Sequence, residues 1–177
     1  MENDYELVDA CLEGNPSAQR SLYDRFSSKM YGVCLRYAKN EEEALDILQD
    51  GFVKVFQKLD KFKKEGSLEG WIRRVIVNTA LDQIRKNKKE QGNVAIDKVE
   101  FMVSSNEYII ENLMAEDLLN ILQQLPAGYR TVFNLFAIEG YSHKEIAEEL
   151  GVTENTSKSQ YSRAKSYMQK LLEKYDY

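Results

Sequence analysis

Apolar residues recur every three or four positions along almost the entire chain, and this helical spacing fails in one main place, residues 90–106. That segment scatters glycine, serine and asparagine among isolated apolar residues. Two prolines and nine glycines in 177 residues are few helix breakers for a chain otherwise rich in leucine, lysine and glutamate. We therefore predict an all-α protein made of two small helical domains joined by a flexible linker.

The aperiodic segment also predicts where the domains end. It is longer than the connections found inside compact domains, which favours a joint between two separately folded units. We predict a first domain over residues 1–89, a linker over residues 90–111 and a second domain over residues 112–177.

Three stretches of the first domain have the spacing of amphipathic helices. One or two helices are expected near residues 22–37, another over about 42–59 and a third over about 68–86. Three glutamates follow Asn40 at the start of the second stretch, where they suit the positive end of the helix dipole. The core side of this helix is expected to consist of Leu45, Leu48, Phe52, Val55 or Phe56, and Leu59.

The second domain contains the sharpest local pattern in the sequence. Ser142 stands three residues before Glu145, which is a capping box that starts a short helix, and Gly151 turns the chain before a longer helix over about 154–172. This order is typical of a helix-turn-helix, whose second helix enters the DNA major groove, although an unrelated helical hairpin has the same geometry. Earlier helices are expected over about 107–124 and 129–138, with Gly140 as a left-handed cap.

The charges of the chain are distributed in blocks. The net charge of −5 by itself argues against a free-standing DNA-binding protein. Residues 54–89, however, contain 11 Lys or Arg against four Asp or Glu, and residues 158–177 contain five against two. This pattern suits a protein that touches DNA at two places after a larger partner has brought it there. Two solvated helix faces remain the alternative on charge alone.

Other classes of protein fit the sequence less well. No apolar run approaches the roughly 18 to 20 residues of a membrane span, and the acidic N-terminus does not resemble a signal peptide, so we expect no membrane insertion and a cytoplasmic location. Cys11 and Cys34 lack the spacing of a disulfide framework and are expected to be reduced and buried.

Catalysis is disfavoured for a similar reason. His143 is the only histidine, and no nucleophile motif, phosphate-binding glycine loop or metal-ligand cluster accompanies it, so we expect no enzyme activity, no cofactor and no small-molecule substrate. A nucleic-acid hydrolase is the alternative from this class. A metal site at Asp46, Asp50 and the glutamates at 41–43 is disfavoured because no histidine accompanies these carboxylates.

Three blocks in register resemble one protein family. Residues 46–55 and 70–85 are similar to the polymerase-binding helix and the promoter-opening helix in region two of the extracytoplasmic-function sigma factors. Leu-Pro at 125–126, Glu-Ile-Ala at 145–147 and Arg-Ala at 163–164 are similar to region four of the same group. The resemblance covers about residues 10–88 and 112–172. It implies a non-enzymatic subunit that binds core RNA polymerase and directs transcription from particular promoters.

The resemblance implies three sets of functional residues. Polymerase binding is assigned to Asp46, Gln49, Asp50 and Val53. Recognition and melting of the promoter minus-10 element is assigned to Phe62, Lys63, Lys64, Trp71, Arg74, Asn78 and Arg85. Recognition of the minus-35 element is assigned to Lys158, Ser159, Ser162 and Arg163. The implied partners are core RNA polymerase, double-stranded and melted promoter DNA, and an inhibitory anti-sigma factor.

The chemistry of these side chains agrees with the implied roles. Trp71 and Asn78 lie two helical turns apart, and such a pair can stack on an unpaired base and hydrogen-bond its edge while nearby cations bind phosphates. Asp46 and Asp50 can accept hydrogen bonds from basic side chains of a partner. A core tryptophan and an ordinary solvated helix face are the alternatives.

Two positions depart from the family pattern. Ser157 stands where an aliphatic residue is usual, which should loosen the packing, and Gln160 stands where a basic residue is frequent, which removes an expected phosphate contact. We therefore expect the free protein to bind DNA weakly. The second candidate function, a stand-alone helix-turn-helix activator of the response-regulator-output type, would leave residues 10–88 unexplained.

Overall fold

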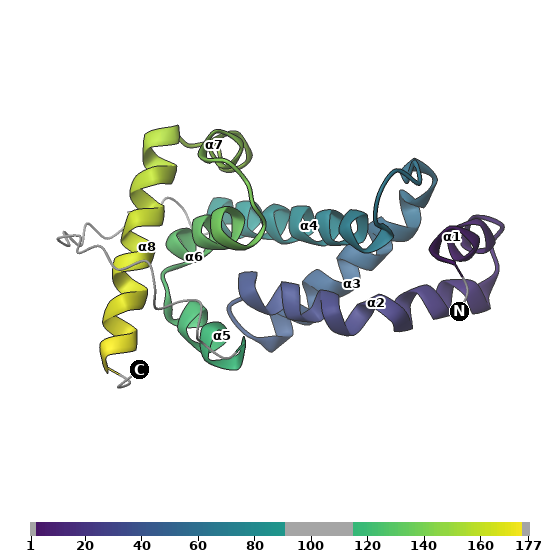
Figure 1. Ribbon diagram of the computed structural model, residues 1–177, viewed down its shortest axis with the longest axis horizontal. Helices are drawn as coiled ribbons and strands as arrows, with labels where there is room; N and C mark the ends of the chain where they lie inside the picture. The colour runs from purple at the N-terminus through teal and green to yellow at the C-terminus, as the bar shows by residue number, and fades with distance from the viewer. Residues whose placement is uncertain (1–2, 91–114, 175–177) are drawn as a thin grey trace. The chain divides into compact units, whose positions relative to one another are not determined.

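In the computed structural model, which describes residues 3–90 and 115–174, every regular element is a helix (Figure 1). The chain divides into two compact units, Met1–Asn87 and Lys88–Tyr177. The prediction of an all-α protein with two small helical domains is thereby confirmed. The predicted linker lies outside the described residues except for Glu90, which is the last residue of a helix.

The first unit contains four α-helices and one short 3₁₀ turn. Three of the helices begin at asparagines, Asn3, Asn15 and Asn40, whose side chains accept hydrogen bonds from backbone N–H groups of the first turn. The N-terminal helix was not expected from the sequence, and the stretch around residues 22–37 is a single helix. In chain order the elements are α1 (Asp4–Leu12), α2 (Pro16–Tyr37), α3 (Glu41–Gln57), η1 (Leu59–Lys61) and α4 (Leu68–Glu90).

The core of the first unit is formed by buried side chains of α1, α2, α3 and α4. The side chains that α3 contributes are Ala44, Ile47, Leu48, Gly51, Phe52 and Val55. Leu45 is not among them, because it is 47% exposed, so its assignment to the core face was wrong. An ideal α-helix advances 100° per residue, so the buried residues lie on an arc that runs from Ile47 to Phe52, and Leu45 lies about 20° beyond Phe52 at the edge of that arc.

Gly51 allows α3 and α4 to approach closely. A Cβ atom at this position would collide with Cδ1 of the buried Ile76 on α4 and would lie 3.7 Å from the Ile76 Cα atom. A side chain at position 51 would have to displace the Ile76 side chain, which is itself buried. Lys54 Nζ on α3 also lies 2.9 Å from Asp82 Oδ2 on α4, so the two helices are joined by packing and by charge.

Both cysteines lie in this unit and are buried, and neither forms a disulfide bond, as expected for reduced thiols. Burial raises the pKa of the Cys34 thiol to about 12, so the thiol stays protonated at neutral pH.

The second unit is built on the expected helix-turn-helix. Ser142 and Glu145 form the predicted capping box, and Gly151 adopts a left-handed conformation (φ 64°) between the last two helices. Gly140 is also left-handed (φ 77°), as predicted. The start expected near residue 107 lies outside the described residues. In chain order the elements are α5 (Ala115–Gln124), α6 (Ala127–Phe133), the π-helical turn η3 (Asn134–Ile138), α7 (His143–Leu150) and α8 (Glu154–Lys174).

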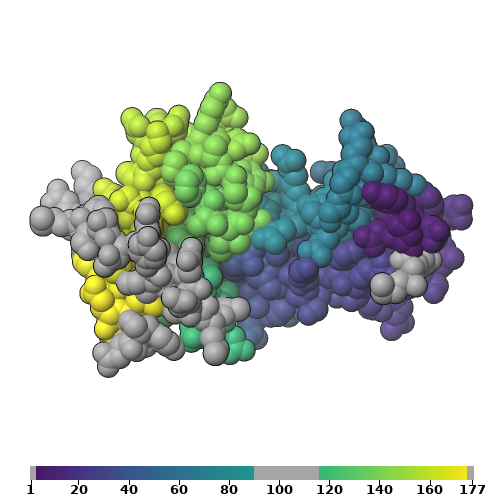
Figure 2. Space-filling model, in the orientation of Figure 1, coloured from purple at the N-terminus to yellow at the C-terminus, as the bar shows by residue number. Residues whose placement is uncertain are grey.

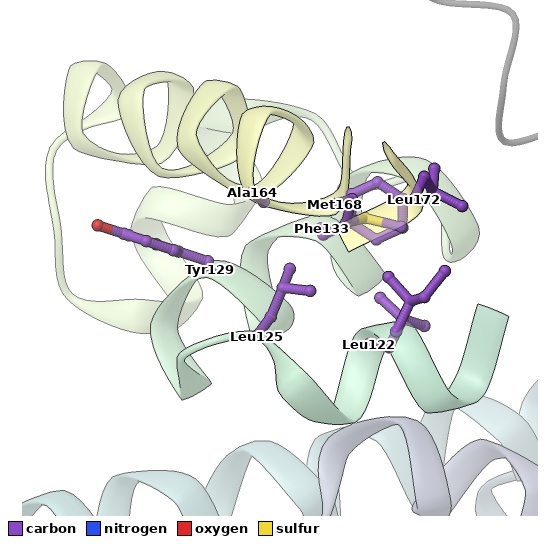
Figure 3. Close-up of a cluster of buried hydrophobic side chains, with 8 residues drawn as sticks. Leu122, Leu125, Tyr129, Phe133, Ala164, Met168 and Leu172 are labelled. Carbon is purple, nitrogen blue, oxygen red and sulfur yellow. The ribbon is translucent and has the colours of Figure 1, made fainter. Parts of the chain in front are cut away.

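The second unit has its own hydrophobic core, which holds α8 against α5 and α6 (Figure 3). Phe133, at the end of α6, is almost completely buried, and its ring stacks on Tyr161 of α8 with a centroid distance of 5.9 Å. The cluster consists of Ile121, Leu122, Leu125, Tyr129, Phe133, Ala164, Met168 and Leu172. Because its members come from α5, α6, α8 and the connection between α5 and α6, this core fixes where the second helix of the helix-turn-helix lies.

Candidate functional site

The exposed side of α3 brings the four predicted polymerase-binding residues together. Asp46, Gln49, Asp50 and Val53 are all exposed and follow one another at helical spacing. Leu45 joins them at the N-terminal end of the stripe, and Val53, which is 54% exposed, stands at its other end. We call Leu45, Asp46, Gln49, Asp50 and Val53 the α3 stripe.

The composition of the α3 stripe suits contact with a large protein. Two exposed aliphatic side chains offer apolar area, and two carboxylates between them can accept charge-assisted hydrogen bonds from Arg or Lys. Sequence analysis missed Leu45, because an aliphatic residue at helical spacing was assigned to the core. No helical pattern could have revealed it, because Leu45 and Phe52 are seven residues apart and lie only about 20° from each other around the helix axis.

The loop before α4 holds Phe62 inside the unit. Phe62 is 6% exposed, and its ring lies 5.6 Å from the Trp71 ring and 6.3 Å from the Tyr5 ring, measured between centroids. The structure thus places Phe62 beneath Trp71, which is itself half-buried, so that the buried ring supports the more accessible one.

Two of the predicted lysines follow Phe62 in this loop. Lys63 is exposed, whereas Lys64 Nζ lies 2.6 Å from Asp9 Oδ1 of α1. Lys64 also has a left-handed backbone (φ 57°), and Tyr5 Oη lies 3.5 Å from the carbonyl oxygen of Gly66. Figure 2 shows α1, in dark purple, against this loop. The helix that sequence analysis did not anticipate therefore contacts one of the predicted DNA-binding segments.

Helix α4 presents Trp71, Arg74 and Asn78 at spacings of three and four residues, which places them on one side of the helix. Arg74 and Asn78 are exposed. Arg85 lies farther along the same side, where its Nη2 donates to Asp82 Oδ1 over 2.6 Å. Burial alone would raise the pKa of Asp82, but hydrogen bonds from Arg85 and Lys54 outweigh it and lower that pKa, so Asp82 is a carboxylate at neutral pH.

Helix α8 carries the last predicted set. Lys158 and Ser159 are exposed, and Ser162 and Arg163 are half-buried one turn later. Lys158 Nζ lies 2.7 Å from Glu154 Oε1, and hydrogen bonding by Lys158 lowers the pKa of that carboxyl group. The four residues therefore form one stripe on the second helix of the helix-turn-helix, which we call the α8 stripe.

Both residues that depart from the family pattern are buried in the structure. Gln160 is 6% exposed and its amide lies near Gly128, so the expectation that this position faces a phosphate was wrong. Ser157 is fully buried, and its Oγ atom lies 3.0 Å from His143 Nδ1. At this position, where the sequence predicted loose packing, the Ser157 hydroxyl therefore has His143 as a polar partner.

No three His, Cys, Asp or Glu side chains within residues 3–90 and 115–174 form a group that could hold a metal ion. In the same ranges, none of the helices combines the length and the apolar character that a membrane crossing requires.

Comparison with protein families assigns both units. Residues 22–90 match the model described as sigma-70 region 2, and residues 115–168 match the model described as sigma-70, region 4. The first match accounts for the segment that a stand-alone helix-turn-helix activator would leave unexplained. Helix α1 lies outside both matches.

Solved structures give the same result for the fold. The chain resembles the sigma factor RpoE of Bartonella quintana, solved with the anti-sigma factor NepR, with a TM-score of 0.53 and 25% identity over 87% of this chain and 96% of that chain. It also resembles CnrH, solved with the cytosolic domain of CnrY, with a TM-score of 0.50 and 23% identity over 94% and 95% of the two chains. The second likeness concerns the fold alone.

Curated relatives match along most of their length. The RNA polymerase sigma factor SigV of Bacillus subtilis is 32% identical over 82% of this chain and 86% of that protein. The ECF RNA polymerase sigma factor SigW of the same organism is 29% identical over 90% and 91%. The chain therefore belongs to the extracytoplasmic-function group of RNA polymerase sigma factors, non-enzymatic subunits that direct promoter-specific initiation of transcription.

Proposed function

We propose that this sigma factor binds core RNA polymerase through the α3 stripe and carries two DNA-binding surfaces to the promoter, α4 with its preceding loop at the minus-10 element and α8 at the minus-35 element. The observation that supports the proposal most is the α3 stripe itself, in which acidic and aliphatic side chains share one exposed helix side. Leu45 and Val53 add apolar contact area to the acceptor carboxylates on the same side of the helix, a combination that suits binding to a basic protein surface.

The minus-10 role of α4 follows from the chemistry of its exposed side. An unpaired base needs an aromatic or apolar wall, a donor and acceptor for its edge, and cations for the neighbouring phosphates. Trp71, Asn78 and Arg74 supply these in one row, and Lys63 adds a cation from the loop. Captured bases offset the cost of melting the duplex, so this step requires no ATP.

The minus-35 role of α8 follows from its place in the helix-turn-helix. The second helix of this motif enters the major groove, where Arg and Lys contact guanine or phosphate. The α8 stripe contains one lysine, one arginine and two serines. Because Lys158 pairs with Glu154 and the whole chain is acidic, DNA binding by the free protein is weak and core polymerase supplies the missing affinity.

The cellular setting is part of the same proposal. A factor that works on polymerase and DNA acts in the cytoplasm. An anti-sigma factor holds it inactive, which is supported by its likeness to RpoE of Bartonella quintana, whose structure was solved with such a protein.

Transcription with purified components tests the proposed function. Core polymerase is mixed with the full chain and a genomic DNA library, and the 5′ ends of the transcripts are mapped. We expect start sites that share an upstream and a downstream element and that are absent with core polymerase alone. A chain that never binds core polymerase, or binds it without producing defined start sites, contradicts the proposal.

Replacing Asn78 with alanine is expected to impair promoter opening more than promoter binding. The exposed amide contacts a base only after the strands separate, so its loss costs about 1–3 kcal/mol in the open complex and little in the closed one. Permanganate reactivity of unpaired thymines measures opening, and a mobility shift measures binding. Asn120→Ala, which removes an exposed amide from α5, is the matched control, and an equal loss in both assays counts against the proposed role.

Replacing Arg163 with alanine is expected to weaken the footprint over the minus-35 element and leave the minus-10 region protected. Loss of one base or phosphate contact costs about 1–3 kcal/mol. DNase I footprinting of the holoenzyme is the measurement. Lys174→Ala removes a cation at the far end of α8 and should leave the footprint unchanged. An unaltered upstream footprint with Arg163→Ala would show that Arg163 does not contact the minus-35 element.

A further inference from the structure

Four side chains meet where the helix-turn-helix joins the rest of the second unit. The His143 ring of α7 stacks on Phe136 of η3 with a centroid distance of 4.2 Å and an interplanar angle of 11°. Tyr161 of α8 lies 4.6 Å from Phe136 and 5.8 Å from His143, measured between ring centroids. The fourth member is Ser157 of α8, whose hydroxyl lies within hydrogen-bond distance of His143 Nδ1. His143 is therefore in contact with both neighbours of α7.

The hydroxyl of Ser157 needs this partner. A fully buried hydroxyl that loses its hydrogen bond costs about 1–3 kcal/mol. In the tautomer with its proton on Nε2, His143 accepts through Nδ1 from the Ser157 O–H group. In the imidazolium form Nδ1 carries a proton and donates to Ser157 Oγ, so the direction of the hydrogen bond reverses and the buried O–H group of Ser157 is left without its acceptor.

We propose that His143 is a positioning residue that holds α8 against α7 through its hydrogen bond to Ser157, and that protonation of the imidazole loosens α8. The inference rests on the proposed role of α8 in reading the minus-35 element. It makes recognition of the upstream element dependent on pH, while polymerase binding through α3 in the first unit does not change.

The charges around His143 support the direction of this effect. Burial and the Lys158 ammonium group of α8 lower the pKa of His143, and Glu154 of the same helix opposes them. Lys144, the next residue in α7, adds a further positive charge. Phe136 of η3 and Tyr161 of α8 are the aromatic groups whose rings lie near the imidazole.

The pH window follows from that direction. The folded-state pKa is lower than the ordinary value of about 6.5. The unfolded chain therefore takes up the proton first as the pH falls. The contribution of the neutral imidazole to stability is fully present above about pH 6.5 and is lost as the pH falls from there through the folded-state pKa.

The sole histidine makes a direct test possible. In the untagged full chain, a nitrogen-15 spectrum contains one imidazole, which reports its tautomer and its titration. Hydrogen exchange of the α8 amides is measured from pH 8 to pH 5 in the wild type, His143→Phe, Ser157→Ala and the double variant. We expect exchange in α8, corrected for intrinsic rates, to become about fivefold faster in the wild type as the pH falls, and to show no such step in His143→Phe. The effects of the two single changes should not be additive.

The apolar pair His143→Phe with Ser157→Val separates a positioning role from a structural one. It keeps the stack on Phe136 and removes the buried hydroxyl, so we expect an ordered α8 and an upstream footprint that no longer depends on pH. Equal pH profiles for the wild type and His143→Phe, or additive single effects, overturn the inference. If the effects of the two single changes are not additive but no variant alters the upstream footprint, the hydrogen bond is supported. The result then overturns the proposed role of α8 in DNA recognition instead.

Discussion

Replacing Asp50 with arginine is expected to weaken binding to core polymerase by at least about 100-fold, which corresponds to roughly 3 kcal/mol. The change removes a carboxylate from the centre of the α3 stripe and places a positive charge opposite the basic side chains that this carboxylate would bind. Asp50 is exposed, so the fold should not change. Affinity is measured by titrating labelled protein with core enzyme.

The control for this variant reverses a charge elsewhere on the same unit. Asp24 lies on α2, where its exposed carboxylate is 3.7 Å from Arg20. Asp24→Arg changes the net charge by the same amount, so a general electrostatic effect would appear in both variants. If both bind core enzyme as the wild type does, the α3 stripe is not the contact surface.

Replacing Phe133 with alanine is expected to unfold the second unit and leave the first intact. Truncation of a buried phenylalanine costs about 3–5 kcal/mol, which is comparable to the whole stability of a small domain. The two units have separate cores, so the loss should stay in the second. The variant should still bind core polymerase but lose its dependence on the minus-35 element.

Hydrogen exchange with mass spectrometry measures this effect, because peptides from the two units report separately. Leu12→Ala is the control, since it truncates a leucine that is half exposed and should cost less than about 0.5 kcal/mol. Uniform loss of protection in both units of Phe133→Ala would show that the units fold as one and would contradict their separation.

The sequence predicted the helices of this protein well where local chemistry sets their ends. The capping box at Ser142 and the left-handed glycines at 140 and 151 depend on nearest neighbours, and the structure contains all three. Helix α1 was missed although Asn3 and Glu6 form a capping box at its start, because it adds only Leu7, Val8 and Cys11 to the core. A segment of nine residues gives too few turns for periodicity to stand out.

The candidate surfaces were predicted less completely, because exposure depends on tertiary packing. The pattern of α3 located Asp46 and Asp50 on the polar side, yet it assigned Leu45 to the core. Gln160 differs, because its spacing of four and eight residues from the buried Ala164 and Met168 places it on their side of α8, and only its polar amide suggested exposure. The partner of Lys64 was also hidden, because Asp9 lies 55 residues away in the sequence.

The close approach of α3 and α4 at Gly51 has a consequence for promoter opening. One side of α3 faces outward with Asp50, and the adjacent residue lies against Ile76 in the middle of the helix that carries Trp71 and Asn78. With no side chain at position 51 to act as a spacer, the backbones of α3 and α4 come close at this point, and the Lys54–Asp82 ion pair joins the same two helices. If polymerase binds α3 as proposed, it also positions α4 and its Trp71 and Asn78, because the two helices pack directly against each other.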